Sequence, residues 1–584
     1  MILQVLKEYY ERKPALPRFG WEERRFPFLV VISESGEFLR FEDTREGENG
    51  HLYLVPALGE KKGNGIKANL FWENIEYMFG MPMPTAVKPN PDQVRVQKQH
   101  EAYCDRIKEL KGSGKTFDAI NRFARSRVNT ERIKKDPLWE KVRRLNTFLL
   151  PKVEHIGVIT EESEIKDAVI RLSKKTGDGS VLTRACLVTG EMGKIARLEP
   201  PIKGVLGKDR KAERSLISFN EESFRSFGKQ KNFNAPVGEL AVFSYTTALN
   251  YLLRSKQRMW VGDASTVFWS AKATKFEGQF KDFFSEPIED NPDRNTDAIK
   301  SLFNAVQNGT LPPMDAHSKF YVLGLAPNAA RIAVRFWIVD TVDGMANKIC
   351  QHFIDTEIVH KPWERDALSL FRMLVSTAVQ DKAENIAPNL PGNTMRAILA
   401  GLPYPQTLLF AVIRRIRAEH DITYPRAAII KACINRSTRY MNPKIKEELK
   451  VSLDLENTNI GYLLGRLFAV LERAQIVSHT QDGGKVPNST IRDRYYGAAS
   501  STPVAVYGTL LNKLAPHHLS KLKSENLRIY FKKLIAQIMD NGIDGKIGFP
   551  AVLSLDNQGR FAIGYYHQMQ EFYTKKIQPK EKLS

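Results

Sequence analysis

The residues from Ile460 onward repeat apolar side chains at the spacing of an α-helix, and this pattern limits the fold more than any other feature. The first stripe occupies positions i, i+3, i+4, i+7, i+8 and i+11, and it consists of Ile460, Leu463, Leu464, Leu467, Phe468 and Leu471. Two further stripes consist of Leu527, Tyr530, Phe531, Leu534, Ile535 and Ile538, and of Phe561, Tyr565, Met569 and Phe572. With a helix expected over residues 502–514, they predict an all-α bundle of four to five helices over residues 446–584.

Residues 1–445 carry a mixed pattern instead. A short amphipathic helix opens the chain, and the apolar run Phe28–Ile32 followed by residues 38–41 predicts a β-hairpin. A basic loop near residues 59–72 then precedes a basic helical section (81–150), a strand-rich core (180–360) and a helical section with proline breaks (361–440). The sequence therefore predicts an α+β fold, with a mixed β-rich N-terminal region that carries helical insertions and an all-α C-terminal bundle.

Three segments of the strand-rich core give more local expectations. Asn234 and Pro236 are expected at the start of a helix whose apolar face includes Tyr245. Residues 285–307 are polar and acidic, and they predict a solvated linker. The alternation over residues 332–339 predicts a strand. One of its faces is expected to hold Ile332, Val334, Phe336 and Ile338, and the other Arg331, Arg335 and Trp337.

The net charge of +21 over 584 residues indicates a polyanionic partner, because long-range attraction and counterion release both favour one. An unrelated basic enzyme would carry the same charge. The four cysteines are far apart and form no C-x-x-C pair, so the sequence predicts neither a zinc ribbon nor a disulfide framework. No signal-peptide core and no uncharged apolar run of membrane-spanning length occurs, and we expect a cytoplasmic protein without membrane contact.

The segment from Val55 to Gly80 joins a basic, glycine-rich loop to an aromatic apolar stretch. Such a loop on a rigid base would direct its polar side chains at a phosphate backbone or a base edge. The residues expected to contact DNA are Lys61, Lys62, Asn64, Lys67 and Asn69. A surface turn in front of a core helix would account for the same composition.

Clusters of arginine elsewhere predict contacts with the RNA or DNA backbone. Arg122, Arg125 and Arg127 lie beside an apolar stripe of helical spacing, although solvated helix faces are often basic as well. Arg331 and Arg335 beside Trp337 would suit phosphates and bases. An ion-paired sheet face is the alternative for these two residues.

Four motifs that resemble catalytic sites lack the partners that catalysis requires. Gly114-Lys115-Thr116 ends like a phosphate-binding loop, but Glu109 stands at the first glycine position and a helix rather than a strand is expected before it. Residues 293–297 mimic a calcium loop that lacks its glycine. His420-Asp421 and His517-His518 have no converging ligands. The sequence therefore predicts no enzyme, no cofactor and no metal site.

Several blocks resemble the family of large subunits of the type I-C CRISPR surveillance complex, Cascade. The blocks are Gly65–Asn74 with Tyr77 and Gly80, the start Met1-Ile2-Leu3-Gln4 with Tyr9 and Tyr10, residues 185–204, 218–254 and 321–337, and the C-terminal segments 462–475, 491–501 and 559–567. Glu199 stands where the family pattern has histidine, so no role of that histidine is carried over. Within or beside these blocks, Lys203, Arg466, Arg492 and Arg494 are further expected nucleic-acid contacts.

The resemblance implies a non-catalytic subunit of an RNA-guided complex. Its implied partners are the crRNA, bound near its 5′ end, the target double-stranded DNA, the displaced single strand, the backbone, 5′-handle and small subunits, and a recruited helicase–nuclease. It further implies recognition of the protospacer-adjacent motif (PAM) and stabilisation of the R-loop. A nuclease acting alone and a stand-alone nucleic-acid-binding protein are the competing classes.

The resemblance also implies that a small subunit matching the C-terminal bundle can arise from an internal start in the same gene. Met441, or a non-AUG codon at Val451, is suitably placed. Extra copies of such a basic bundle would line the displaced strand.

Overall fold

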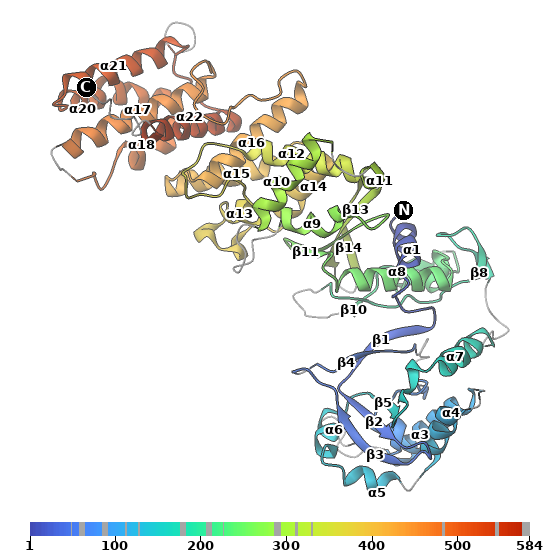
Figure 1. Ribbon diagram of the computed structural model, residues 1–584. Coiled ribbons are helices and arrows are strands. Elements are labelled where there is room, and N and C mark those ends of the chain that lie inside the picture. Colours follow the sequence, from blue (N-terminus) through green and yellow to red (C-terminus); the bar gives the residue numbers. More distant parts are fainter. Residues whose placement is uncertain are drawn as a thin grey trace. The chain divides into compact units, whose positions relative to one another are not determined.

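The structure is a computed structural model. It describes residues 1–47, 49–57, 65–83, 92–110, 112, 114–126, 129–175, 183–205, 213–225, 227–284, 294–309, 313–328, 331–481, 485–543 and 548–574. The chain forms two compact units. Unit 1 comprises residues 1–201 and 217–251, and unit 2 comprises residues 202–216 and 252–584. The predicted α+β class is confirmed, with sheets in both units and with helices as the regular elements of the described residues after residue 341 (Figure 1). The predicted division between residues 445 and 446 stays a prediction.

Unit 1 is built on a four-stranded sheet of order β3-β2-β5-β6. Its strands are β2 (Phe28–Ile32), β3 (Phe38–Asp43), β5 (Leu149–Val153) and β6 (Gly157–Val158), and β1 (Trp21–Phe26) pairs separately with β4 (His51–Pro56). Strands β2 and β3 form the predicted hairpin, and β2 pairs in parallel with β5. All five residues of β2 are buried, which explains its continuous apolar run.

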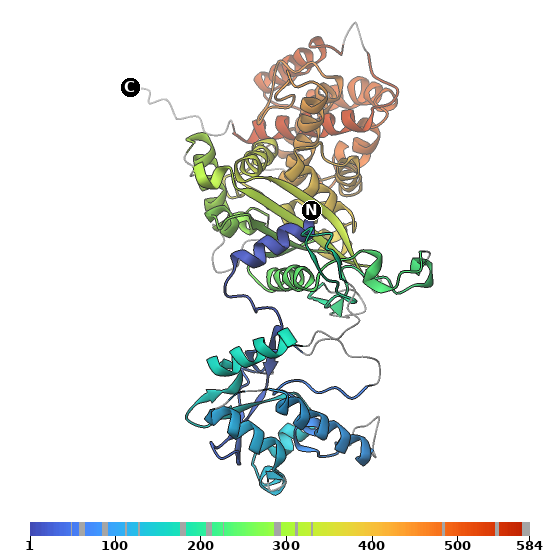
Figure 2. The ribbon, with the colours of Figure 1, turned by 90° about the vertical axis from the view of Figure 1, so that its right-hand side faces the viewer.

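Helices cover this sheet and extend unit 1. They are α1 (Ile2–Arg12), α2 (Ile75–Phe79), α3 (Gln93–Lys108), α4 (Lys115–Arg125), α5 (Asn129–Lys134), α6 (Trp139–Leu145), α7 (Ser163–Lys175) and α8 (Glu239–Leu252), which ends at the boundary with unit 2. Figure 1 shows α3 and α4 beside the sheet, and apolar side chains of both helices share its core. Helix α1 lies beside α8 (Figures 1 and 2), where the rings of Tyr10 and Phe243 lie 5.9 Å apart. A short hairpin, β7 (Thr183–Ala185) and β8 (Met192–Lys194), completes the strands of this unit.

The predicted helix entry at Asn234 and Pro236 is wrong. A short 3₁₀ turn ends at Asn234, and α8 begins only at Glu239. The apolar face predicted around Tyr245 is confirmed, because Tyr245 is buried together with Ala241 and Leu249, one turn before and after it.

Unit 2 contains an antiparallel sheet of order β11-β12-β13-β14. Its strands are β11 (Arg258–Val261), β12 (Ala264–Ser270), β13 (Lys319–Asn328) and β14 (Arg331–Thr341), and a separate pair is formed by β9 (Ile202–Lys203) and β10 (Glu213–Arg214). The strand predicted at residues 332–339 is confirmed as β14.

The predicted faces of β14 are wrong because of a β-bulge. Phe336 pairs with Gly324 and Val334 pairs with Leu325, so Arg335 has no opposite residue. The bulge shifts the alternation, and Arg331 and Trp337 therefore lie on opposite faces of the sheet. Phe336 is buried, whereas Val334 is 44% exposed.

Helices pack around this sheet and continue to the end of unit 2. They are α9 (Lys275–Gln279), α10 (Arg294–Gln307), α11 (Pro313–Ala316), α12 (Val342–Thr356), α13 (Leu370–Val375), α14 (Leu390–Ala400), α15 (Gln406–Glu419) and α16 (Tyr424–Met441). The linker predicted at 285–307 is wrong for residues 294–307. There the apolar side chains of Ile299 and Leu302 are buried in the core and hold α10 in place. The remainder of that segment lies outside the described residues.

The C-terminal helices predicted from the three stripes and at residues 502–514 are confirmed. They are α17 (Ile460–Thr480), α21 (Glu525–Asp540), α22 (Leu555–Thr574) and α19 (Val504–Thr509), which a π-helical turn (Leu510–Leu514) continues. The structure adds α18 (Ile491–Ala499) and α20 (Ala515–Ser520), which were not predicted. The stripe on α21 is only partly covered, because Leu527 and Tyr530 are exposed while Phe531 and Ile538 are buried.

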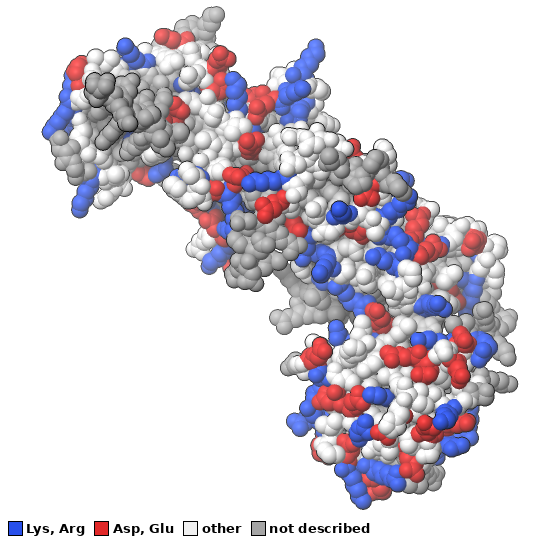
Figure 3. Space-filling model, in the orientation of Figure 1, with Lys and Arg blue, Asp and Glu red and all other residues white. Residues whose placement is uncertain are grey.

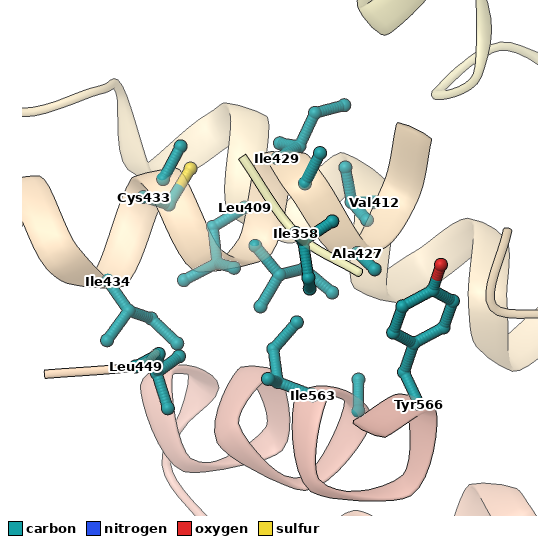
Figure 4. Close-up of a cluster of buried hydrophobic side chains, with 14 of the residues drawn as sticks. Ile358, Leu409, Val412, Ala427, Ile429, Cys433, Ile434, Leu449, Ile563 and Tyr566 are labelled. Atoms are coloured by element: carbon teal, nitrogen blue, oxygen red, sulfur yellow. The ribbon is translucent and has the colours of Figure 1, made fainter. Parts of the chain in front are cut away.

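Helices α17 and α22 lie side by side (Figure 1) and approach closely at glycines. A Cβ atom at Gly465 would lie 1.9 Å from the carbonyl oxygen of Phe561, and one at Gly564 would lie 2.1 Å from that of Tyr462. Helix α22 also packs on α15 and α16. Ile563 and Tyr566 point toward Leu409 and the side chains of α16 (Figure 4), within a single apolar core.

Candidate nucleic-acid interface

The base of the predicted DNA-binding loop is fixed by one buried carboxylate. Glu73 Oε1 accepts hydrogen bonds from the backbone nitrogen of Asn69 at 3.0 Å and from Asn69 Nδ2 at 2.8 Å. Glu73 Oε2 accepts a third from the backbone nitrogen of Asn74 at 3.1 Å. Asn74 in turn caps α2 by accepting from the backbone nitrogen of Tyr77. These bonds hold residues 69–77 as one rigid segment.

The backbone between Asn69 and Glu73 is strained and held from three sides. Phe71 has a φ angle of +77°, which residues other than glycine rarely adopt. Its carbonyl oxygen accepts a hydrogen bond from the Tyr103 hydroxyl at 2.9 Å, and Trp72 Nε1 donates to the carbonyl oxygen of Pro56 at 2.9 Å. Glu73 exchanges backbone hydrogen bonds with Leu149 of β5. Strained backbone supported in this way is typical of functional segments.

The residues of the loop that are predicted to contact DNA differ in their exposure. Asn69 is only 1% exposed, and its amide group faces Glu73. Lys67 is half-buried, two residues after the exposed Gly65. Lys61, Lys62 and Asn64 lie outside the described residues. A base contact by Asn69 stays a prediction, and it requires the amide to leave its present hydrogen bonds.

Helix α4 presents two of the predicted arginines to solvent. Its buried face consists of Thr116, Phe117, Ala119, Ile120, Phe123 and Ala124. Arg122 and Arg125 are exposed on the other side, and neither forms an ion pair with a described residue. Arg127 lies outside the described residues. Sequence reasoning missed Arg95 and Lys98 on the adjacent α3, which are also exposed cations; their i, i+3 spacing is the signal that could have found them.

Other cations of the basic helical section are neutralised by acidic neighbours. Arg132 pairs with Glu37 at 2.6 Å, Arg143 with Glu140 at 2.8 Å, and Lys141 with Asp43 at 3.3 Å. Figure 3 shows the same alternation of basic and acidic side chains on the visible face of unit 1. Arg122 and Arg125 differ from these paired residues, and they share exposure without an ion pair to a described residue with Arg95, Lys98, Lys135 and Arg144.

The cations of the strand-rich core differ in their partners. Arg335 Nη2 contacts Asp263 Oδ2 at 2.7 Å, and both side chains are partly exposed. Arg331 is half-buried and its backbone forms a parallel bridge with Ser215. Lys203 is exposed on β9. Nucleic-acid binding by these three residues stays a prediction.

Glu199 accepts hydrogen bonds from two groups of unit 1. Its Oε1 accepts a hydrogen bond from the Tyr245 hydroxyl, and its Oε2 accepts one from the backbone nitrogen of Ile217 at 3.1 Å. Burial raises the pKa of Glu199 to about 6, although both hydrogen bonds favour the charged form. The carboxylate thus joins residue 217 to α8.

The predicted contacts of the C-terminal helices lie at different depths. Arg466 is fully buried in α17, where its Nε donates to Gln568 Oε1 at 3.2 Å and neither Nη atom has a described partner. Arg492 is half-buried and lies 3.6 Å from Glu472. Arg494 is exposed and forms no ion pair with a described residue. Burial of Arg466 leaves Arg494 as the accessible member of the three.

Sequence reasoning missed a basic surface on α21. Lys532 and Lys533 are exposed next to Tyr530, whose side chain is 41% exposed. The sequence signal was the pair of lysines directly after two aromatic residues. Exposed cations beside an aromatic ring suit a single-stranded nucleic acid.

The motifs that resemble catalytic sites are held in ordinary structural elements. Helix α3 runs up to Lys108, so a helix rather than a strand precedes Gly114, as predicted. His420 ends α15 in a left-handed conformation. Within the described ranges, no group of three or more His, Cys, Asp or Glu side chains is arranged to hold a metal ion. None of the described helices is long and apolar enough to cross a membrane.

Comparison with known proteins supports the resemblance seen in the sequence. The family model described as CRISPR-associated protein (Cas_Csd1) matches residues 6–573. No curated protein matches the sequence. The match covers nearly all of both units, and all of the candidate contacts lie within it. The chain belongs to the Cas_Csd1 family, the large subunit of the type I-C CRISPR surveillance complex Cascade.

Proposed function

We propose that this Cascade subunit binds the 5′ end region of the crRNA, recognises the PAM duplex and stabilises the R-loop before a separate helicase–nuclease is recruited. One observation carries the proposal. Arg122 and Arg125 are exposed without acidic partners, in a section where Arg132, Arg143 and Lys141 are ion-paired. Unpaired guanidinium groups keep their full attraction for phosphate, whereas paired ones are already neutralised.

The complex with bound guide RNA provides the test. Arg122→Glu together with Arg125→Glu is expected to weaken binding of target duplex about tenfold or more, because phosphate contacts are replaced by repulsion. The matched control, Arg132→Glu with Arg143→Glu, changes the same charge at ion-paired positions and is expected to change binding less than about threefold. Equal losses in both double variants, measured by filter binding, would contradict an α4 interface.

Recognition of the PAM is assigned to the loop that ends at the rigid segment 69–77. Lys67 is its described cation, and Asn69 is the group able to read a base edge if it leaves Glu73. Asn69→Ala is expected to lower motif discrimination by about 1–3 kcal/mol if the amide contacts a base. An unchanged preference among DNA duplexes that differ only in the motif, together with a lowered Tm, would assign Asn69 to structure alone.

The C-terminal helices are assigned to the displaced strand. Lys532, Lys533 and the exposed ring of Tyr530 supply the cations and the stacking surface that single strands require. Lys532→Gln with Lys533→Gln is expected to weaken single-strand binding and R-loop stability several-fold. Lys444→Gln with Lys446→Gln removes the same charge before α17 and serves as the control. If the control lost as much single-strand binding as the α21 variant, the loss would reflect net charge alone and not a contact at α21.

The subunit is further proposed to be non-catalytic. The support is the failed spacing of the phosphate-binding motif at Glu109 and the isolated His420-Asp421 pair. Purified chain with Mg²⁺ or Mn²⁺ and ATP is expected neither to hydrolyse nucleotide nor to cut DNA. Activity that co-elutes with the chain and disappears in His420→Ala would overturn this assignment.

A separate C-terminal species is part of the proposal. A chain that starts at Met441 or Val451 retains α17 to α22 with their glycine contacts, but it loses the cover that α15 and α16 give to Ile563 and Tyr566. We therefore expect this species to be stable only when bound within the complex. Mass spectrometry of the complex from the intact gene tests this, and finding full-length chain alone would defeat it.

A further inference from the structure

Arg24 on β1 lies in the angle between two aromatic rings. Its Cζ atom is 4.3 Å from the ring centre of Trp72 and 4.3 Å from that of Phe148. The centres of these two rings are 5.1 Å apart and their planes meet at 77°, so the guanidinium group is held from two sides. Because its orientation is already fixed, binding a ligand costs little further side-chain entropy.

The hydrogen-bonding edge of this guanidinium group remains available. The Arg24 side chain donates no hydrogen bond to any described residue, and 33% of it is exposed. Its acidic contact among the described residues is Glu22, whose Oε1 lies 3.6 Å from Arg24 Nη1, too far for a hydrogen bond. Aromatic contacts engage the faces of a guanidinium group, and its in-plane N–H groups stay free for an anion.

Arg24 lies at the base of the loop to which recognition of the PAM is assigned. Trp72, one of its two aromatic contacts, belongs to the rigid segment 69–77, and Trp72 Nε1 donates to the carbonyl oxygen of Pro56 at 2.9 Å. Strand β1 pairs along its length with β4, which ends at Pro56. Direct contacts therefore join Arg24 to the rigid segment and to the strand that leads into the loop.

The depth of Arg24 favours a phosphate group over a base edge as its ligand. A side chain that reads a base must extend into a groove of the duplex, whereas Arg24 is half-buried in a strand. Phosphate groups project outward from the duplex, and a guanidinium fork binds two of their oxygens at once. Glu22 reduces the local positive potential, but it leaves this fork open because it reaches no N–H group.

We propose that Arg24 is a positioning residue that clamps one backbone phosphate of the target duplex next to the PAM. The contact would fix the register of the duplex, so that the segment 69–77 meets the same base pairs at each encounter. The inference rests on the proposed function, because that function places the duplex at this segment. It adds a phosphate contact outside the residues that the sequence assigned to nucleic acid.

Salt titrations of duplex binding by the guide-bound complex test the proposal. Arg24→Gln is expected to weaken binding about fivefold, equally for duplexes with different motifs, and to reduce the slope of log K against log salt by about 1. The matched control is Arg25→Gln, the next residue on β1, which points to the other face of the strand and donates to the carbonyl oxygen of Gly50 at 2.9 Å. It removes the same charge and is expected to keep the parent slope.

Single methylphosphonate substitutions in the DNA identify the clamped phosphate. In the parent complex, neutralising this phosphate is expected to weaken binding about fivefold. In Arg24→Gln the same substitution is expected to weaken binding less than about twofold, because the contact is already lost. Equal costs in the parent and in Arg24→Gln at every phosphate tested would overturn the proposal.

Arg24→Lys separates a phosphate contact from a structural role. Lysine keeps a cation beside both rings, so we expect the parent slope, with binding about twofold weaker because an ammonium group lacks the bidentate fork. A lowered Tm with the parent slope in Arg24→Gln would assign Arg24 to structure alone, and an altered motif preference would make it a base-reading residue. Loss of the guide RNA from Arg24→Gln would place its contact on RNA. Each of these three results overturns the clamp.

Failure of the proposed function gives a different result. A parent complex that does not bind motif-bearing duplex would reject that function and the clamp with it. A parent that binds this duplex, with Arg24→Gln equal to it in affinity and slope, would reject the clamp alone.

Discussion

Helices α4 and α17 both carry arginines that the sequence assigns to nucleic-acid binding, but the structure places them at opposite depths. Helix α4 buries one face and leaves Arg122 and Arg125 exposed on the other. In α17 every residue from Gly461 to Glu472 is buried, and Arg466 is 0% exposed. The same residue type on a regular helix therefore has different surroundings, because one helix is covered on one side and the other on all sides.

The difference lies in how closely the neighbouring helix approaches. Gly465 allows the backbone of α22 to contact α17 directly, and α17 loses the solvent-facing side that an amphipathic helix normally has. An arginine on such a helix must enter the core with its guanidinium. The glycine beside Arg466 is therefore as useful as the charge itself for predicting whether this arginine is buried or exposed.

The largest expected effect is that of a methyl group at the glycine contact. Gly465→Ala places a Cβ 1.9 Å from the carbonyl oxygen of Phe561, so α17 and α22 must separate. We expect a loss of about 3 kcal/mol in the free energy of unfolding, as for a strongly overpacked core. Gly497→Ala on α18 is the control, because nothing lies near its added Cβ, and it is expected to be neutral or slightly stabilising. Equal melting temperatures of the two variants would disprove the close contact.

The next largest expected effect comes from variants of Arg466, which test whether this arginine stabilises the fold or binds DNA. Arg466→Ala removes packing and is expected to cost about 2 kcal/mol more than Arg466→Met, which keeps the volume and removes a guanidinium with two unpartnered Nη atoms. DNA binding by the complex is expected to be unchanged in Arg466→Met. If Arg466→Met weakened DNA binding without changing the denaturation midpoint, Arg466 would instead be a DNA-binding residue.

Glu199 extends the comparison to a half-buried carboxylate, both of whose oxygens accept hydrogen bonds. Because the folded state raises its pKa to about 6, it binds the proton more tightly than the unfolded state does. Its contribution to stability is therefore present below the ordinary carboxyl pKa and is lost as the pH rises through about 6. Glu199→Gln lacks this dependence and is expected to gain about 1–2 kcal/mol relative to the parent between pH 4.5 and pH 7. Parallel stability curves of the two proteins would contradict it.

Periodicity made much of the fold predictable. The apolar run of β2 and the stripes of α17 and α22 determine their elements, because burial of one face requires a fixed spacing. The bulge at Arg335 was not predictable in this way, since an extra residue in one strand is defined by the partner strand. Helix α10 was missed because the acidic residues drew more weight than the spacing of Ile299 and Leu302.

The candidate site was less predictable than the fold. Arginines on α4 were identified because the apolar stripe beside them defines the exposed side. Asn69 was assigned to DNA because its side chain can read a base, but Glu73 four residues later provides a hydrogen-bond acceptor within the chain. Whether a polar side chain faces a ligand or its own neighbour depends on tertiary packing, which a single sequence does not contain.

The smallest expected effect on stability belongs to the exposed helix. Arg122→Gln with Arg125→Gln removes two charges that contact no described acidic group, so the free energy of unfolding is expected to change by less than about 0.5 kcal/mol. If both guanidinium groups bind phosphates, the slope of log K against log salt for duplex binding should become less steep by about 2, because two fewer counterions are released. The Gln variant of the ion-paired residues Arg132 and Arg143 is expected to keep the parent slope, since their charges are already compensated by Glu37 and Glu140. Titrations at several salt concentrations measure both slopes, and a parent-like slope in the α4 variant would place its arginines on a solvated face.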